Sequence, residues 1–335
     1  MSEQATLPVQ PSRTLAMIES EEVVGRASLF APFSQGLLRA AEVHAGLCVL
    51  TADLAKYTDI ADFRSRYPER FFNVGMAEQS LVTTAAGLSK VGKIAYCTTY
   101  GTFATRRAYD FLAIACAHSN ENVKMFAGNP GLASGYGGTH QANEDLALMR
   151  SIPNMTVLDP CDATEMQQIA EMAAEIPGTV YCRLLRANVP VVFDPATYRF
   201  QVGRGHRIGA GEDVGFVSTG SMTERVIDAS RALQADGVQS SIFHSPSIKP
   251  FDVDGLLDFA MSVRRLVVCE NHVSMGGLAS LVIDALQDAG LQRKVLKIGI
   301  PDKFTECGSH QFLLDRYGLT QQKIHARVNA WLEQA

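Results

Sequence analysis

The sequence predicts an α/β protein made of two doubly wound α/β domains, and three observations lead to that prediction. Short apolar runs rich in β-branched residues alternate along the chain with longer segments that repeat apolar residues every three or four positions. This alternation is typical of βαβ units and a mostly parallel sheet. It stops at residues 188–211, which contain two prolines and four glycines, and then restarts. The chain of 335 residues is long enough for about two domains.

In the first domain, each predicted strand is followed by a helical pattern. The segment after Glu78 places Leu81, Ala85 and Leu88 near a repeat of three to four residues, and a later segment does the same with Phe111 and Ile114. The expected strands are 47–51, 71–74, 94–98, 123–127, 155–158 and 179–184. The expected helices are 33–43, 78–90, 103–118, 142–150 and 163–175.

The second domain repeats this alternation and ends in an amphipathic helix that carries Ile324, Val328 and Trp331 on one side. Its expected strands are 214–218, 238–243, 266–269 and 295–298, and its other helices are 221–236, 253–263 and 276–289. The predicted organisation is a flexible tail (1–20), a first domain (21–190), a linker (191–212) and a second domain (213–335).

Composition excludes several classes of protein. A formal net charge of −5 with 19% charged residues argues against a disordered chain and against a polybasic nucleic-acid binder. No apolar run approaches the length of a membrane span. The first residues have no basic segment followed by an apolar one, so we expect no secretory signal.

The seven cysteines indicate a reducing compartment. Their number is odd and their spacing wide, and Cys48, Cys97, Cys182 and Cys269 each lie inside an apolar, strand-like run. Such positions favour buried thiols over disulfides, and so a cytoplasmic location. The sequence has neither a C-x-x-C pair nor a His/Cys cluster, so no metal site is predicted within this chain.

Two motifs follow predicted strands and could hold a ligand. In F-F-N-V-G-M-A-E-Q a strand leads through a glycine turn to Glu78 at a helix start, where α/β sheets place their ligands. A glutamate in the first turn of a helix can also serve only to complement the helix dipole. The glycine-rich loop 128–141 ends in His140, which could bind substrate, or could be a surface histidine on a flexible crossover.

Two further motifs lie at the ends of other strands. Arg183 and Arg186 close the strand at 179–184, where they suit either a phosphate or carboxylate fork or ordinary ion pairs. In the segment 98–109, Tyr100 and Phe103 precede a basic pair that begins at Arg106. These residues would suit a stacked heteroaromatic ring beside an anion, or aromatic side chains that face the core.

Together, and in this chain order, the motifs resemble the C-terminal half of transketolases. The matching segments are G-M-A-E-Q, Y-G-T-F, the glycine-rich loop ending in G-G-T-H-Q, R-A-N, and the later H-S-P-S-I-K-P-F-D. The similarity covers roughly residues 21–335. It implies a pyrimidine-binding domain followed by a transketolase C-terminal domain. Deoxyxylulose-phosphate synthases and the β subunits of 2-oxo-acid dehydrogenases share the same two-domain half.

The resemblance also implies a cofactor and a partner. The family binds thiamine diphosphate between two domains, one of which holds the diphosphate and a divalent metal such as Mg²⁺ through a GDG…N motif. This sequence has no GDG motif. We therefore expect a natural half-enzyme, active only with an N-terminal-half subunit that carries the diphosphate and the Mg²⁺, in an α2β2 assembly.

By the same resemblance, the site residues receive roles. Glu78 is expected to hydrogen-bond the pyrimidine ring and to be catalytic, with Phe103 stacked on that ring. His140 is expected to be catalytic and to bind substrate oxygen atoms. The remaining expected residues are, for the cofactor, Tyr100, Tyr109 and Asp53, and, for the sugar phosphate, Arg186, Arg183 and Arg106.

Three positions depart from the family pattern. Tyr136 stands where many relatives have an aspartate that binds a substrate hydroxyl, Gly128 where some have a histidine, and Ala31 where classical transketolases have an arginine. These departures indicate an unusual donor, such as a branched sugar like apulose 4-phosphate or a sulfonate.

The sequence therefore predicts a cytoplasmic transketolase subunit that moves a two-carbon ketol unit from a ketose phosphate to an aldose, without nucleic-acid or membrane partners. Two alternatives stay open. A 2-oxo-acid dehydrogenase β subunit would be distinguished by an assay with a lipoyl-domain acceptor. A non-catalytic homologue is disfavoured by the presence of Glu78, Phe103 and His140.

Overall fold

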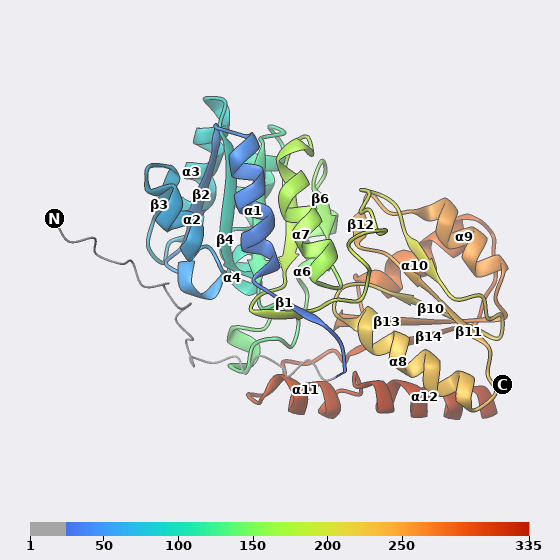
Figure 1. The fold of residues 1–335 in the computed structure, drawn as a ribbon. Coiled ribbons are helices and arrows are strands. Elements are labelled where there is room, and N and C mark those ends of the chain that lie inside the picture. Colours follow the sequence, from blue (N-terminus) through green and yellow to red (C-terminus); the bar gives the residue numbers. More distant parts are fainter. Residues whose placement is uncertain (1–24, 335) are drawn as a thin grey trace.

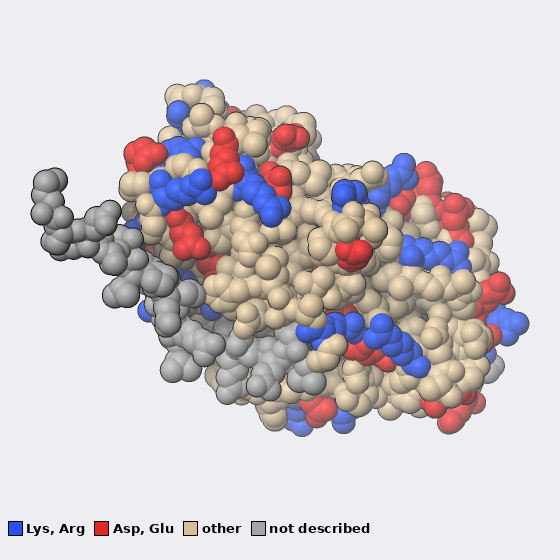
Figure 2. Space-filling view, in the orientation of Figure 1, with Lys and Arg blue, Asp and Glu red and all other residues tan. Residues whose placement is uncertain are grey.

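The protein consists of two α/β domains that lie side by side, as Figure 1 shows. This computed structural model describes residues 25–334. The expected tail at 1–20 lies outside the described residues. Within the described part, positive and negative side chains are mixed over the face shown in Figure 2. In residues 25–334, no helix combines the length and apolar character needed to cross a bilayer.

The first domain is built on a seven-stranded sheet in the order β12-β6-β7-β5-β4-β2-β3. Six of these strands are parallel, as the alternation of strands and helices predicts. They are β2 (Leu47–Thr51), β3 (Phe71–Asn73), β4 (Ile94–Tyr100), β5 (Val123–Gly128), β6 (Thr156–Leu158) and β7 (Val180–Leu184). The seventh, β12 (Ser247–Lys249), comes from the later half of the chain and pairs antiparallel with β6.

Helices cover both faces of this sheet, which confirms the doubly wound prediction. One apolar cluster packs Phe33 and Ile169 against one face, and another packs Leu81 against the other. At Gly36 an added Cβ would lie 2.2 Å from the Gln167 carbonyl oxygen, so glycine lets the first helix approach α7 closely. The helices are α1 (Pro32–Val43), α2 (Ala61–Arg66), α3 (Glu78–Lys90), α4 (Gly101–Arg106), α5 (Tyr109–Phe111), α6 (Asp145–Ser151) and α7 (Ala163–Met172).

The second domain has a five-stranded sheet in the order β14-β13-β10-β11-β9, parallel except for β9. Ile324 and Val328 of the last helix are buried in its core, and Trp331 packs against it, as the amphipathic pattern predicts. The strands are β9 (His206–Ile208), β10 (Val214–Ser218), β11 (Ser240–His244), β13 (Arg265–Val273) and β14 (Val295–Ile300). The helices are α8 (Met222–Ala235), α9 (Val253–Met261), α10 (Leu278–Asp288), α11 (His310–Arg316) and α12 (Gln321–Glu333).

Two predicted helices were wrong in their extent. The helix expected at 103–118 breaks after α4, because Ala108 has ψ near 13°, and it resumes as α5 and the π-helical turn Leu112–Ala117. The helix expected at 142–150 starts only at α6. Its first residues are held elsewhere, since Ala142 forms bridges to the loop and the Asn143 carbonyl accepts a hydrogen bond from Val273 N.

The stretch expected as a linker is packed rather than open. Phe193 and Phe200 are buried, and β9 within the stretch joins the second sheet. Just before it, β8 (Asn188–Pro190) pairs antiparallel with β1 (Ser28–Phe30) near the start of the described chain. The seven cysteines are free, and all are buried except Cys307.

Candidate functional site

The carboxyl ends of the parallel strands bring the four motifs to one edge of the first sheet. Glu78 begins the helix that follows β3, and Tyr100 is the last residue of β4. Gly128 closes β5 and opens the glycine-rich loop, while Arg186 follows β7. Because parallel strands share their carboxyl edge, residues far apart in the sequence converge here. The arrangement matches the sheet-edge placement that the sequence predicts.

Glu78 is a buried carboxylate with one cationic partner. It is 2% exposed although it occupies the first turn of α3. Arg107, which directly follows α4, donates from Nη1 to both Glu78 carboxylate oxygens at 3.2 and 3.3 Å. The same guanidinium lies over the Phe103 ring, 4.0 Å from its centre. Arg107 is not among the site residues predicted from the sequence, although its spacing of four residues from Phe103 predicts a shared helix face.

Aromatic rings gather around Phe103, the ring over which the Arg107 guanidinium lies. The Phe103 ring centre lies 5.8 Å from that of Tyr100 and 5.3 Å from that of His140, which meets it edge-on. His140 is held by Thr139, whose Oγ1 lies 2.9 Å from Nδ1 of the imidazole. Tyr136 lies with its ring centre 5.0 Å from that of His140. The structure thus groups Phe103, Tyr100 and His140, as expected for a joint site.

Tyr109 and Asp53 occupy different surroundings. Tyr109 packs against the core and its hydroxyl lies 3.0 Å from Oγ of Ser151, at the end of α6. Asp53 follows β2 with a φ of 59°, a left-handed conformation that costs energy outside glycine. Its Oδ1 accepts a hydrogen bond from Asn73 Nδ2 at 2.8 Å, and Asn73 Oδ1 accepts one from Gly75 N at 3.0 Å. Asp53 therefore braces the turn that leads to the start of α3.

Arg106 supports the glycine-rich loop. Its guanidinium pairs with Glu144 and donates to the carbonyl oxygens of Gly138 at 2.6 Å and of Gln141 at 3.3 Å. The Phe304 ring of the second domain lies 6.0 Å from its Cζ. These contacts place Arg106 as a strut that holds the loop carrying His140, rather than as a free cation.

Arg183 lies in the buried core of the domain junction. Its guanidinium donates to both carboxylate oxygens of Asp145, to Asp159 at 3.1 Å and to the Asn271 carbonyl at 3.2 Å. Burial alone would raise the pKa of Asp145, but the Arg183 charge and its hydrogen bonds hold that pKa below its usual value. With its donors directed to these partners and 1% of the residue exposed, Arg183 belongs to the junction rather than to the substrate site.

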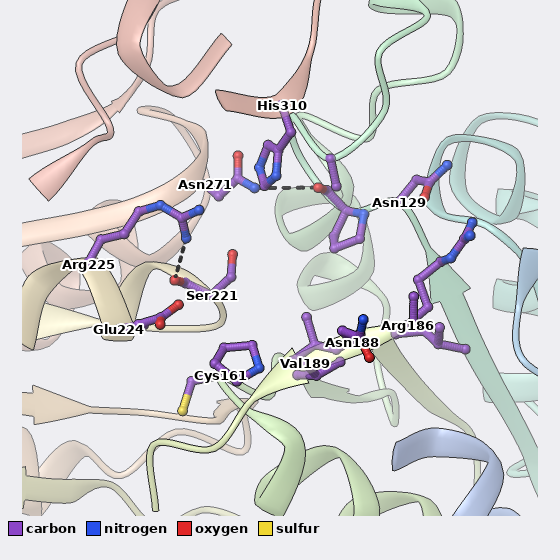
Figure 3. A pocket seen from close by; sticks show the side chains of 16 residues that line it. Asn129, Cys161, Arg186, Asn188, Val189, Ser221, Glu224, Arg225, Asn271 and His310 are labelled. Atoms are coloured by element: carbon purple, nitrogen blue, oxygen red, sulfur yellow. Dashed lines mark hydrogen bonds between the residues drawn. The ribbon is translucent and has the colours of Figure 1, made fainter. Parts of the chain in front are cut away.

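Arg186 lines a cavity of about 130 Å³ at the domain junction. Figure 3 shows it across the cavity from Arg225, which donates to the Ser221 carbonyl oxygen at 3.1 Å. Nε and Nη1 of Arg186 are buried and have no hydrogen-bond partner among the described residues. Burial raises the pKa of the nearby Tyr100 hydroxyl, against the opposing effects of the Arg186 charge and a hydrogen bond with Asn129. A guanidinium that has two buried nitrogen atoms without hydrogen-bond partners and lies beside a cavity is suited to an anion.

The departures from the family pattern fit their surroundings. Gly128 faces the Tyr100 ring, and an added Cβ there would lie 3.5 Å from Cδ1 of that ring. Ala31 adopts a φ of 49° and donates its N–H to the Ala187 carbonyl at 2.8 Å. Ala187, next to Arg186, is also left-handed with a φ of 56°. Backbone strain of this kind concentrates at binding sites, where the surrounding structure fixes it.

One group of ligand-type side chains is not predicted from the sequence. Cys161, Glu165 and His244 are buried together and are the group within residues 25–334 that could hold a metal ion. His244 Nε2 lies 3.0 Å from both Glu165 oxygens, and its Nδ1 lies 2.7 Å from Thr223 Oγ1. The cluster joins α7 to β11 across the two domains, so no spacing within one segment could reveal it.

Comparison with known proteins agrees with this architecture. Residues 28–192 match the family model of the transketolase pyrimidine binding domain, and residues 203–324 match that of the transketolase C-terminal domain. A solved structure described as a split gene transketolase, inactive β4 tetramer, aligns with a TM-score of 0.81 at 39% identity. The alignment covers 90% of this chain and 97% of that one. The fold is therefore that of a transketolase pyrimidine-binding domain followed by a transketolase C-terminal domain.

Sequence relatives cover nearly the whole chain. An uncharacterised transketolase family protein of Sinorhizobium fredii is 42% identical over 96% of this chain and 94% of its own length. A 6-deoxy-6-sulfo-D-fructose transketolase subunit of a Clostridium species is 32% identical over 86% of this chain and 89% of its own length. The chain belongs to the transketolase family.

Proposed function

We propose that this chain is the pyrimidine-binding subunit of a two-chain, thiamine-diphosphate-dependent transketolase. It transfers a two-carbon ketol unit from a ketose carrying a terminal anion to an aldose acceptor. The observation that carries the proposal is the buried carboxylate of Glu78, which Arg107 links to the Phe103 ring at the carboxyl edge of the first sheet. A partner subunit supplies the diphosphate and Mg²⁺ half of the site, in an α2β2 assembly.

The residues present fit the aminopyrimidine ring of that cofactor. Glu78 offers a buried hydrogen-bond acceptor, and Phe103, which Arg107 links to it, offers an aromatic face with Tyr100 beside it. A flat heteroaromatic ring can stack on such a surface while its edge meets the carboxylate. When bound, the cofactor supplies the electron sink that carbon–carbon bond transfer requires.

The residues of this chain then have separate roles in the reaction. Glu78 holds a proton at the ring nitrogen N1′, which it shares through a charge-assisted hydrogen bond. His140, oriented by Thr139, meets the oxygen atoms of the substrate and moves a proton there. Tyr136 lies against the imidazole and narrows the space around it.

Arg186 is the residue proposed to bind the terminal anion of the donor. A planar guanidinium forms two parallel hydrogen bonds with a phosphate or a sulfonate, and two of its nitrogen atoms are buried without a partner in the described chain. Both anions suit this geometry. The Clostridium relative is named for a sulfonated sugar. The other candidate donor is the phosphate ester of a branched sugar, such as apulose 4-phosphate.

The test measures the assembled complex and the chain alone. We expect the chain by itself to be inactive, and activity to appear when a subunit containing the GDG…N motif is added. In the complex, Glu78→Gln should slow hydrogen–deuterium exchange at C2 of bound thiamine diphosphate by about 100-fold or more, which is about 2.7 kcal/mol. Glu69→Gln, which changes an exposed glutamate, is the matched control.

Two results would contradict the proposal. Full transketolase activity of the purified single chain would remove the need for a partner. Exchange at the wild-type rate in Glu78→Gln would remove this carboxylate from the chemistry and would favour a non-catalytic role.

A further inference from the structure

The planar guanidinium of Arg107 contacts both groups that are proposed to hold the cofactor ring, the Glu78 carboxylate and the Phe103 ring. Its guanidinium donates to the two Glu78 oxygens at 3.2 and 3.3 Å. Its Cζ lies 4.0 Å from the centre of the Phe103 ring, which is a stacking distance. The contacts of a bound aminopyrimidine would be the same in kind, namely a hydrogen bond to the carboxylate and stacking on the aromatic face.

The surroundings of Arg107 allow its side chain to leave this position. Its side chain is 49% exposed, whereas that of Glu78 is 3% exposed. The helix also breaks directly after it, at Ala108, so that Arg107 stands at the C-terminal end of α4, just before α5 begins at Tyr109. A long side chain in this position can turn into solvent by rotation of its own bonds, without movement of the sheet or of α3.

Pairing with Arg107 compensates for the burial of the Glu78 carboxylate. A carboxylate as buried as Glu78 is costly without a cation or hydrogen-bond donors, and Arg107 is the cation that the structure places against it. The ion pair between Arg107 and Glu78 must break before another hydrogen-bond donor can reach Glu78 over that face of Phe103.

We infer that Arg107 occupies the place of the aminopyrimidine in the unloaded subunit, and that it turns outward when the cofactor binds. This inference rests on the proposed function, because it takes Glu78 and Phe103 as the residues that hold the ring. Arg107 is thus a competitor of the cofactor within the chain itself. It keeps the isolated subunit stable and sets the affinity of the assembled one.

The direction in which a mutation changes the affinity for the cofactor distinguishes an Arg107 that competes with the ring from one that supports it. If Arg107 competes, Arg107→Ala should tighten the binding of thiamine diphosphate to the assembled two-chain complex by about tenfold, because the ion pair no longer has to be broken. If Arg107 supports the bound ring, the same change weakens binding. Isothermal titration calorimetry of the complex with thiamine diphosphate and Mg²⁺ measures the affinity without any turnover.

Stability provides a second readout with the opposite sign. Arg107→Ala should lower the melting temperature of the isolated chain, because Glu78 is left buried without its cation. Arg107→Met keeps an aliphatic stem over Phe103 and serves if the alanine variant fails to fold. Arg64→Ala, an exposed arginine that lies over Phe71, is the control for lost positive charge and should change neither quantity.

Failure of this inference differs from failure of the proposed function. Weaker or unchanged cofactor affinity in both Arg107 variants would overturn the competition, while slow C2 exchange in Glu78→Gln would still uphold the role of the carboxylate. Normal C2 exchange in Glu78→Gln would instead overturn the proposed function. Tighter binding in the Arg107 variants, together with a lower melting temperature, supports the inference.

Discussion

Two arginines at the end of β7, three positions apart, have opposite surroundings. Arg183 is buried among two aspartates and a backbone carbonyl, and each of its three terminal nitrogen atoms donates a hydrogen bond. Arg186 stands beside a cavity, and its Nε and Nη1 have no partner in the described chain. The difference shows how one strand end serves two purposes: a saturated arginine fixes the domains, and an unsaturated one is available for a ligand.

The same contrast extends beyond these two side chains. At the domain junction, the Glu165–His244 pair is also completed by further hydrogen bonds, from Tyr198 and from Cys161 N. At the sheet edge, the half-exposed Arg107 is the one side-chain partner of the Glu78 carboxylate within residues 25–334. Saturated polar groups specify one arrangement, whereas groups with a replaceable partner provide binding energy.

The largest expected effect is on stability, at Arg183. Arg183→Met should lower the free energy of unfolding by about 3–5 kcal/mol, because Asp145 and Asp159 would remain buried without their cation. Urea unfolding followed by circular dichroism measures this, with Arg64→Met as an exposed control. A loss below about 1 kcal/mol would show that the two junction aspartates do not depend on Arg183.

The next effect is on substrate, at Arg186. Arg186→Ala should lower kcat/KM by about 10- to 1000-fold through loss of two charge-assisted hydrogen bonds, at about 1.4 kcal/mol per decade. Arg186→Lys should recover part of this, since an ammonium cannot form the planar fork. The melting temperature should change little, in contrast to Arg183.

A donor sugar without its terminal anion is the control for Arg186. With that donor, wild type and Arg186→Ala should have similar kcat/KM, and C2 exchange should be the same in both. An equal loss with both donors would assign Arg186 a structural role and remove the contrast with Arg183.

A further expected effect, of at most about 1.4 kcal/mol for each pH unit, concerns Lys124, a buried lysine at the start of β5. It is fully buried, its Nζ donates to the carbonyls of Ile176 and Gly178, and burial lowers its pKa to about 7. The unfolded chain then binds a proton that the folded chain lacks between about pH 7 and 10.4, so stability should rise with pH in this window.

The expected slope from Lys124 is at most about 1.4 kcal/mol per pH unit, and it should disappear in Lys124→Met. Urea unfolding at several pH values between 7 and 10 measures it. A slope that is unchanged in the variant would assign the pH dependence to other groups.

The sequence predicts the parallel strands and most helices because their apolar periodicity is local. It also brings Glu78, Phe103 and His140 to one site, through motifs that resemble a known family. It does not predict β12, because three residues of an irregular segment carry no periodicity. It does not distinguish the surroundings of Arg183 from those of Arg186 either, since the partners of Arg183 lie 24 to 88 positions away along the chain. Arg107 was within reach of helix periodicity, but its pairing with Glu78, 29 positions away, was not.

The strand β12 has a consequence for the order in which the protein is made. It completes the first sheet by pairing with β6, yet it is synthesised after β9, β10 and β11 of the second domain. On the ribosome, the first domain therefore emerges with the backbone groups of β6 unpaired along one edge. Such an edge can pair with other chains until residues 247–249 arrive to cover it. A chain cut between the domains would keep this exposed edge permanently, and we expect it to aggregate.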